Sequence, residues 1–423
     1  MTNLPIILPR AEHHISRKQF DEKTLKVLYR LRGQNFKAYL VGGCVRDLLL
    51  NRVPKDFDVA TDATPGQVKK LFRNCFLVGR RFRLAHIRFG SELVEVATFR
   101  RHAHADDLPE DPADHHHFRE NVFGTPEEDA FRRDFTINAL FYDIDSFAII
   151  DYVGGLRDLA ERRLRVIGDP LIRYQEDPVR MLRALEFAAR LDFTLDPATH
   201  DGILHCAPLI AGAAPARVRE ELQNLFRYGI AGAVLRAAAE TQLLAPLLAG
   251  YQTDATTLRM LDAIDQRTAQ GEPAVAEGFA LALLFASAFV HKTAKLNTLS
   301  DALPLSSTLL AGHCEHFHIA SGIRHQAREL LLALFRYLRG PGQRGEKRFL
   351  VHAVAQEGFD LFRLFVAATG EGEELLNRWQ QHLERNRQPE LAQSAAEGTT
   401  KGPRKRRRRR SGKKRSAPTP TEQ

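Results

Sequence analysis

The sequence contains only four cysteines in 423 residues and no long apolar run. The cysteines lack the spacing of a metal-binding motif or of a disulfide framework. No apolar run reaches the length of a transmembrane helix, and residues 1–18 lack the apolar stretch and the small-residue cleavage pattern of a signal peptide. We therefore expect no membrane segment and no secreted disulfide scaffold, and the reducing cytoplasm is the expected location.

The sequence also has no excess of positive charge except in one segment, residues 401–423. The net charge is +9, but residues 401–423 carry eleven Lys and Arg against one Glu, a net of +10, so the first 400 residues sum to about −1. This segment has no apolar periodicity, which predicts a disordered basic tail that binds an anionic polymer such as RNA. A tail that serves only solubility is the alternative. The candidate RNA contacts in the tail are Lys405, Arg406, Arg407 and Arg408.

A pair of glycines follows a short apolar run at residues 39–41. The run and the amphipathic segment after the glycines predict a strand, a tight turn and a helix. Because Gly42 and Gly43 have no β-carbons, backbone amides at the turn can approach an anion, and the helix start and Arg46 add positive charge. The pattern indicates a phosphate site, although such a turn is more often only a turn.

Two carboxylates stand close together a few residues later, in the segment Asp56-Phe57-Asp58. Strand periodicity sends both carboxylates to one face and Phe57 to the other. Neighbouring carboxylates repel each other, and a cation between them relieves the repulsion. Their hard oxygen ligands favour Mg²⁺, which also takes substrate phosphates as ligands. A solvated strand end is the alternative, and the preceding glycine turn disfavours it.

Residues 77–98 form two runs with period-two patterning joined at Gly90-Ser91, which predicts a β-hairpin. In the second run Val94 and Val96 share one face, while Glu95 lies on the other and is a candidate third carboxylate facing the Asp pair, or else an edge-strand charge. The first run carries a cluster of basic residues suited to a polyanion, namely Arg80, Arg81 and Arg83. The histidine-rich segment 102–118 that follows predicts a mobile loop rather than a metal site.

Two further segments carry charged residues in defined positions. In the first, Arg132, Arg133 and Asp134 lead into an alternating strand over residues 135–141, with a surface ion-pair cluster as the alternative. In the second, Asp177 caps a helix with Pro178 in its first turn.

The helix that begins there also bears two arginines. Asp177, Arg180 and Arg183 repeat every three residues and share a face, where a carboxylate and a guanidinium can pair with the edge of an adenine base. A capping Asp177 with solvated arginines is the alternative.

These motifs, GGCVRDLLL, KDFDVAT, RRDFTINAL, DYVGGLRDL and EDPVRMLRALEFAARL, together resemble the class II tRNA nucleotidyltransferase/poly(A) polymerase family of the polymerase-beta-type superfamily. The resemblance is dense over residues 15–191. The stretch LVGRRFRLAH (77–86) resembles the one that separates bacterial poly(A) polymerases from CCA-adding enzymes. One departure is Glu186, where the family usually has a basic residue, and it weakens any RNA contact assigned there.

The resemblance implies a role for each candidate residue. Mg²⁺, or Mn²⁺, is expected at Asp56 and Asp58, with Asp134 or Glu95 contributing, and ATP is the expected substrate. Gly42, Gly43 and Arg46 are expected to hold the triphosphate. Arg132 and Asn138 are expected near the triphosphate and sugar, and Asp177, Arg180 and Arg183 near the base.

The predicted architecture is an α/β nucleotidyltransferase head with a mixed sheet, followed by all-α neck and body domains. The expected boundaries are an arm over 1–20, the head over 21–160, the neck over 161–230, an RNA-binding body over 231–384 and the tail over 385–423. The expected function is template-independent addition of AMP to RNA 3′ ends, on mRNA, small RNA or decay intermediates, with RNA-decay machinery as a possible partner. The alternatives are a CCA-adding enzyme and an inactive RNA-binding protein.

Overall fold

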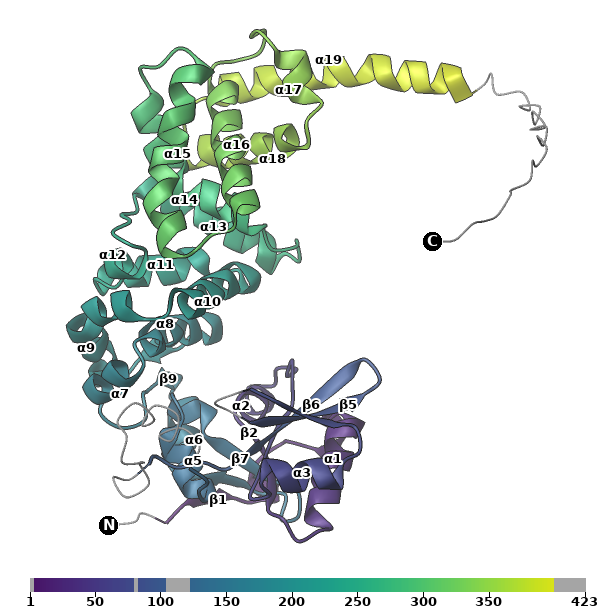
Figure 1. Cartoon of the computed structure of the whole chain (residues 1–423), viewed down its shortest axis with the longest axis vertical. Coiled ribbons are helices and arrows are strands. Elements are labelled where there is room, and N and C mark those ends of the chain that lie inside the picture. The colour runs from purple at the N-terminus through teal and green to yellow at the C-terminus, as the bar shows by residue number, and fades with distance from the viewer. Residues whose placement is uncertain (1–3, 80–82, 104–121, 399–423) are drawn as a thin grey trace, which may run out of the picture.

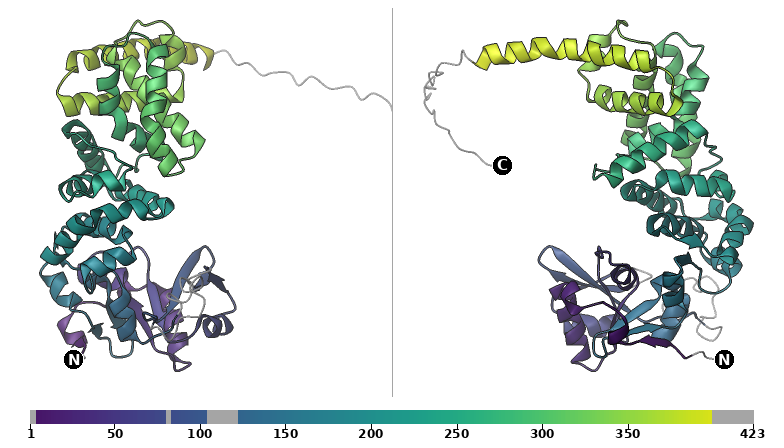
Figure 2. Two further views of the ribbon diagram at one scale, coloured as in Figure 1. Left: turned by 60° about the vertical axis from the view of Figure 1, so that its left-hand side comes forward. Right: turned by 180° about the vertical axis from the view of Figure 1, so that it is seen from behind.

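The computed structural model describes residues 4–79, 83–103 and 122–398, with side chains in the last range as far as residue 385. A head containing the sheet lies at one end, and helices follow one another along the long axis, with α19 (Glu373–Gly398) extending sideways from the far end (Figures 1 and 2). Among the described helices, none is both long enough and apolar enough to cross a membrane.

In the described part of the chain, eight strands form one mixed sheet in the order β1-β8-β7-β2-β3-β6-β5-β4. The β3–β6 pair is parallel and the other pairs are antiparallel. The strands of this sheet are β1 (Ile6–Leu8), β2 (Ala38–Val41), β3 (Asp58–Thr61), β4 (Cys75–Val78), β5 (Leu84–Phe89), β6 (Glu92–Thr98), β7 (Leu140–Asp143) and β8 (Ile149–Asp151). A separate pair joins β9 (Arg163–Leu164) to β10 (Thr194–Leu195).

The helices of the head cover both faces of this sheet. On one face, α1, α2 and α3 pack over a core that includes Leu40, Val59 and Val96. On the other face, a smaller cluster joins Ala130 of α5 to Val41, Ala60 and Phe141. The head helices are α1 (Glu22–Arg32), α2 (Gly43–Leu49), α3 (Pro65–Leu71), α5 (Pro126–Arg132) and α6 (Gly155–Ala160).

After the head the described chain is almost entirely helical, as the sequence predicted. The apolar helix α14 (Glu277–Thr293) lies at the centre of the body, where it packs against α16 (Ser321–Leu338), α15 (Leu299–His316) and α18 (Ala353–Thr369). The remaining helices are α7 (Pro170–Glu176), α8 (Val179–Leu191), α9 (Pro197–Cys206), α10 (Pro215–Tyr228), α11 (Ala231–Glu240), α12 (Leu244–Leu247), α13 (Ala255–Ala269), α14 (Glu277–Thr293), α15 (Leu299–His316), α16 (Ser321–Leu338), α17 (Glu346–Leu350), α18 (Ala353–Thr369) and α19 (Glu373–Gly398).

Two segments differ from their sequence-based expectation. Residues 4–20, expected as an arm, contribute β1 to the edge of the head sheet, where Ile7 pairs with Ile150. The strand expected over residues 135–141 begins only at Leu140, because Thr136–Asn138 form the 3₁₀ turn η4. Two side-chain bonds stabilise this turn: the Thr136 hydroxyl donates to Asp158 of α6 at 2.5 Å, and the Asn138 side-chain amide donates to nearby Asp134 at 3.2 Å.

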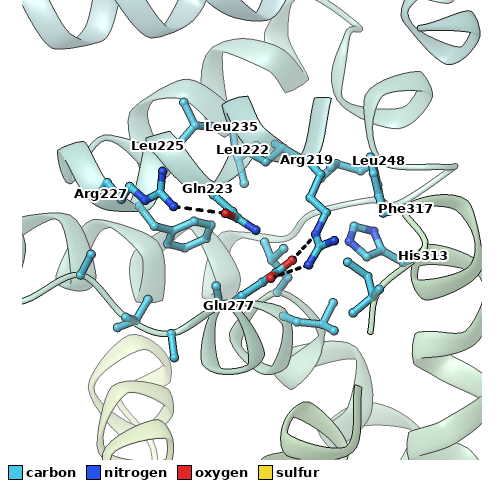
Figure 3. A pocket seen from close by; sticks show the side chains of 18 residues that line it. Arg219, Leu222, Gln223, Leu225, Arg227, Leu235, Leu248, Glu277, His313 and Phe317 are labelled. Atoms are coloured by element: carbon cyan, nitrogen blue, oxygen red, sulfur yellow. Dashed lines mark hydrogen bonds and ion pairs between the residues drawn. The ribbon is translucent and has the colours of Figure 1, made fainter. Parts of the chain in front are cut away.

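A cavity of about 320 Å³ lies where the neck meets the body, between α10, α14 and α15 (Figure 3). Its walls are mostly apolar, with leucine the commonest residue, and its polar side carries a bidentate ion pair in which Arg219 donates to Glu277 at 2.6 and 2.7 Å. Burial, with His316 adding positive charge, lowers the pKa of His313 beside this pair to about 4. His313 is therefore neutral at pH 7.

This buried histidine predicts a loss of stability in acid. An unfolded histidine takes up its proton near pH 6.5, whereas folded His313 resists protonation until about pH 4, although the nearby Glu277 partly favours the charged form. The free energy of unfolding should fall between pH 6.5 and 4, with His313 contributing up to ~3 kcal/mol. Urea unfolding across this range should show a weaker pH dependence in His313→Gln but not in a variant of exposed His325, His325→Gln. Equal pH dependence in both variants would contradict this assignment.

Candidate active site

The glycine turn after β2 is tightly constrained. Gly42 has φ +75°, a conformation that L side chains rarely adopt, and its amide donates to the Leu140 carbonyl at 3.2 Å. A β-carbon at Gly42 would lie 3.2 Å from Nη1 of Arg133. Helix α2 starts at once with Gly43, so the turn and the helix start lie together at the end of β2, as the sequence predicted.

Arg46 is held beside this turn by buried contacts. Its side chain is 4% exposed, and its guanidinium donates to Asp47 at 2.8 Å and to the Asn138 side-chain oxygen at 2.5 Å. The guanidinium also lies 5.2 Å from the centre of the Phe187 ring on α8. Burial lowers the pKa of Arg46, with Asp47 acting in the opposite direction. Arg46 is thus a fixed cation that joins the head to the first neck helices.

Two carboxylates meet across the parallel pair of strands β3 and β6. Val59 pairs with Val96, so Asp58 and Glu95, each one residue earlier, are neighbours on the same face. Burial is the main cause that raises the pKa of Asp58 to about 6. Repulsion from Glu95 and, more weakly, from Asp56 also raises this pKa, whereas the positive charge of Arg133 lowers it. The strand begins at Asp58 rather than at Asp56, which is exposed and precedes it.

These carboxylates are the candidate ligands of a metal ion. Among the described residues, no group of three or more His, Cys, Asp or Glu side chains is arranged to hold a metal ion. The repulsion between Asp58, Glu95 and Asp56 is nevertheless of the kind that a cation relieves, and Mg²⁺ commonly takes only one or two protein carboxylates with phosphate and water. The donor set therefore fits Mg²⁺ with substrate phosphates as additional ligands.

Arg133 and Asp129 belong to the site, although no specific role was predicted for them from sequence. Arg133 donates to the Asp129 carboxylate at 3.1 and 2.9 Å and to the Asn138 carbonyl at 3.3 Å. Asp129 is buried and also accepts a bond from the Arg100 amide at 3.1 Å. Their spacing of four residues, from helix α5 to the residue that caps its C-terminus, was the available sequence signal. It places Arg133 against Gly42 and within electrostatic reach of Asp58.

Asp134 faces the neck. Its carboxylate accepts bonds from Arg183 of α8 at 2.7 and 3.2 Å and from the Asn138 amide at 3.2 Å. Burial opposes ionisation, but these donors outweigh it and lower the pKa of Asp134. Arg183 also bonds Glu221 of α10 at 3.2 Å. The geometry shows Asp134 as the anchor of a head–neck ion pair, whereas the carboxylate beside Asp58 is Glu95.

Asp177 and Arg180, the other two residues expected near the base, also form ion pairs. Asp177 accepts a bidentate pair of bonds from Arg217 at 3.1 and 2.8 Å, and Arg180 donates to Glu176 at 3.1 Å. Helix α8 begins at Val179 rather than at Pro178, and Asp177 lies before it, accepting from the Val179 amide at 3.3 Å. Asp177, Arg180 and Arg183 thus bind three different partners.

Arg132, expected near the triphosphate, lies 3.8 Å from Asp129, and its carbonyl accepts a bond from Arg173. Glu186, the departure from the family pattern, is only 3% exposed and pairs with Arg190 at 3.3 Å. Burial raises the pKa of Glu186, while Arg190 and Arg183 oppose this effect. Glu186 is thus enclosed among arginines and is not a surface contact.

Several basic candidates lie outside or at the edge of the described residues. Arg83 is exposed just before β5. Arg80 and Arg81, the tail residues Lys405 to Arg408 and most of the histidine-rich segment lie outside the described residues.

A mixed sheet with a glycine turn at the end of β2, carboxylates on β3 and β6 and a helical neck defines a nucleotidyltransferase. Three family models match: the poly A polymerase head domain over 38–165, the probable RNA and SrmB-binding site of polymerase A over 192–253, and the polymerase A arginine-rich C-terminus over 297–414. The chain belongs to the class II nucleotidyltransferase/poly(A) polymerase family, and within this family it is similar to the bacterial poly(A) polymerases I.

Similarity to individual proteins supports this assignment. The chain is 41% identical over 377 residues to poly(A) polymerase I of Salmonella typhi, an alignment that spans 85% of this chain and 81% of that protein. The chain is 39% identical over 221 residues to a CCA-adding enzyme of Bacillus licheniformis, an alignment that spans 52% of this chain and 54% of that protein. Among solved structures, a Bacillus stearothermophilus CCA-adding enzyme in complex with CTP matches with a TM-score of 0.64 at 26% identity, over 86% of this chain and 83% of that one.

Proposed function

We propose that this protein is a template-independent poly(A) polymerase that transfers AMP from ATP to the 3′-hydroxyl of RNA and releases pyrophosphate. The observation that carries the proposal is the juxtaposition of a glycine turn bearing Arg46 with the Asp58–Glu95 carboxylate pair. The extent of similarity to poly(A) polymerase I, at 85% of the chain against 52% for the CCA-adding relative, supports polymerisation over CCA addition.

Each part of the site has a separate task in this reaction. Backbone amides of Gly42 and Gly43, with Arg46, bind the triphosphate and orient its α-phosphate toward the incoming hydroxyl. Asp56, Asp58 and Glu95 would hold Mg²⁺, and the bound ion would supply positive charge for the leaving pyrophosphate. Arg133 is positioned by Asp129 to counter the charge of these acids.

Selection of the base is assigned to the neck. Asp177 is paired with Arg217, and Arg180 is paired with Glu176. Both ion pairs are exposed or half-buried, so replacing them by hydrogen bonds to the edge of an adenine base costs little free energy. Arg183 is bound to the buried Asp134 and is assigned to joining head and neck. The RNA itself is bound by basic residues of the body and the tail, and mRNA, small RNA and decay intermediates are the proposed substrates.

Primer extension distinguishes this function from its two alternatives. The purified protein is incubated with Mg²⁺, a labelled unstructured RNA and each nucleoside triphosphate alone, and product length is read on a gel. The proposal predicts a long ladder with ATP alone. Addition of a few nucleotides that requires CTP, on a tRNA lacking its 3′ end, would show a CCA-adding enzyme, and RNA binding without extension by any nucleotide would show an inactive binding protein.

A further inference from the structure

The open face of the β4–β5–β6 hairpin region continues directly from the carboxylates. Phe76 of β4 pairs with His86 of β5, and His86 pairs with Glu95 of β6. Glu95 in turn neighbours Asp58 across the parallel pair β3–β6. The register therefore lines up Phe76, His86, Glu95 and Asp58 in one row on one face of the sheet, and this row ends at the site of AMP transfer.

This face carries exposed apolar side chains on β4 and β6. Phe76 is 55% exposed, and Val78 and Leu93 on the same face are 46% and 54% exposed. The opposite face of these strands is fully used, because Ala85, Ile87 and Val94 are buried in the head core. Figure 1 shows β5 and β6 at the end of the head away from α5 and α6. The exposed aromatic ring of Phe76 is thus not part of the core.

The row also carries hydrogen-bonding and basic groups. Nε2 of His86 lies 3.5 Å from the Glu95 carboxylate, which places the imidazole between the acids and Phe76. Arg88, two residues along β5 on the same face, is exposed. Because β-strands are spaced about 4.8 Å apart, Phe76 lies three strands, or about 14 Å, from Asp58. The surface therefore offers an aromatic face and positive charge at a short, fixed distance from the carboxylates.

We propose that this face, defined by Phe76, His86 and Arg88, binds the last nucleotides of the RNA strand, with a base stacked on the Phe76 ring. The inference rests on the proposed function, because a 3′-hydroxyl placed at Asp58 and Glu95 requires the strand behind it to lie on adjoining surface. Stacking on an aromatic ring is available to every base, so this contact suits a polymerase that extends arbitrary 3′ ends. Arg88 binds the phosphates of the same nucleotides.

Replacement of the aromatic ring tests the platform. In Phe76→Ala the KM for an unstructured RNA and its dissociation constant, measured by fluorescence anisotropy without ATP, should rise about ten-fold, while kcat at saturating RNA and the KM for ATP stay unchanged. Phe76→Trp should retain wild-type affinity, and Phe76→Leu should behave as Phe76→Ala. Tyr29, an aromatic residue 45% exposed on α1 at the other face of the sheet, gives the matched control Tyr29→Ala, which should bind RNA normally.

The outcomes separate this inference from the proposed function. Wild-type RNA affinity in Phe76→Ala, or full affinity in Phe76→Leu, would overturn the stacking platform even if the wild-type protein makes poly(A). Absence of poly(A) synthesis by the wild type would overturn the proposed function, whereas weaker RNA binding by Phe76→Ala would still support the platform. A change from dimer to monomer on Phe76→Ala, seen by light scattering, with RNA affinity unchanged, would show that the face instead binds a second copy.

Discussion

Replacement of Asp58 by alanine is expected to slow AMP transfer by on the order of 10²-fold or more without destabilising the protein. The carboxylate is needed where charge develops during phosphoryl transfer, so its loss should appear in kcat. In the folded protein, however, the ionised form is unfavourable, because burial and Glu95 raise the pKa of Asp58 to about 6. Single-turnover extension of a labelled RNA measures the rate, and thermal unfolding without metal should give a melting temperature equal to or above that of the wild type.

A control carboxylate lies on the same segment of chain. Asp62 is exposed and follows β3, where its side chain accepts a bond from the Lys37 amide at 2.8 Å. Asp62→Ala should retain turnover within a factor of about two, since it lies at the other end of the strand from the glycine turn. Normal turnover in Asp58→Ala would remove the carboxylate pair from the mechanism.

Replacement of Arg183 by methionine is expected to lower the free energy of unfolding by about 3 kcal/mol at pH 7, because it leaves the largely buried Asp134 without its ion-pair partner. The pKa of Asp134 is lowered when Arg183 is present, so the pair stabilises the fold above the ordinary carboxyl pKa and loses this effect as the pH falls through the lower folded value. Without Arg183, burial favours the protonated form of Asp134, which can then take up a proton at pH 4 and relieve part of the loss. Urea unfolding at pH 7 and pH 4 should therefore show the larger deficit of the variant at pH 7.

The matched control for this pair is exposed. Arg217 makes a similar bidentate contact with Asp177, but its side chain is 57% exposed, so Arg217→Met should cost less than about 1 kcal/mol. Equal losses in the two variants would mean that the Asp134–Arg183 contact does not anchor the head to the neck.

Local patterns were sufficient to predict the glycine turn, the hairpin and the opposite facing of Glu95 and Val96, because alternation and turn chemistry act within a few residues. The register between β3 and β6 joins residues 37 positions apart, so the sequence could suggest but not establish that Glu95 stands beside Asp58. Apolar alternation misled at residues 135–141, where side-chain bonds of Asn138 and Thr136 replace the first part of the strand by a turn.

The ionic partners of the neck were beyond the reach of sequence patterns. Spacing of three placed Asp177, Arg180 and Arg183 together, but their partners Arg217, Glu176 and Asp134 come from α10, α7 and the segment between α5 and η4. The edge strand β1 was also not predicted from the sequence. Its residues Ile6 and Ile7 are both more than half exposed, so they show no alternation between a buried and an exposed face.

Mn²⁺ binding, followed by electron paramagnetic resonance in the presence of ATP, tests most directly which acids form the catalytic centre. If Asp58 and Glu95 are the pair, Glu95→Gln should weaken Mn²⁺ binding at least ten-fold, while Asp134→Asn leaves it within about two-fold, since the Asp134 carboxylate is bound to Arg183. Loss of Mn²⁺ binding in Asp134→Asn with normal binding in Glu95→Gln would contradict the account and make Asp134 the third metal ligand.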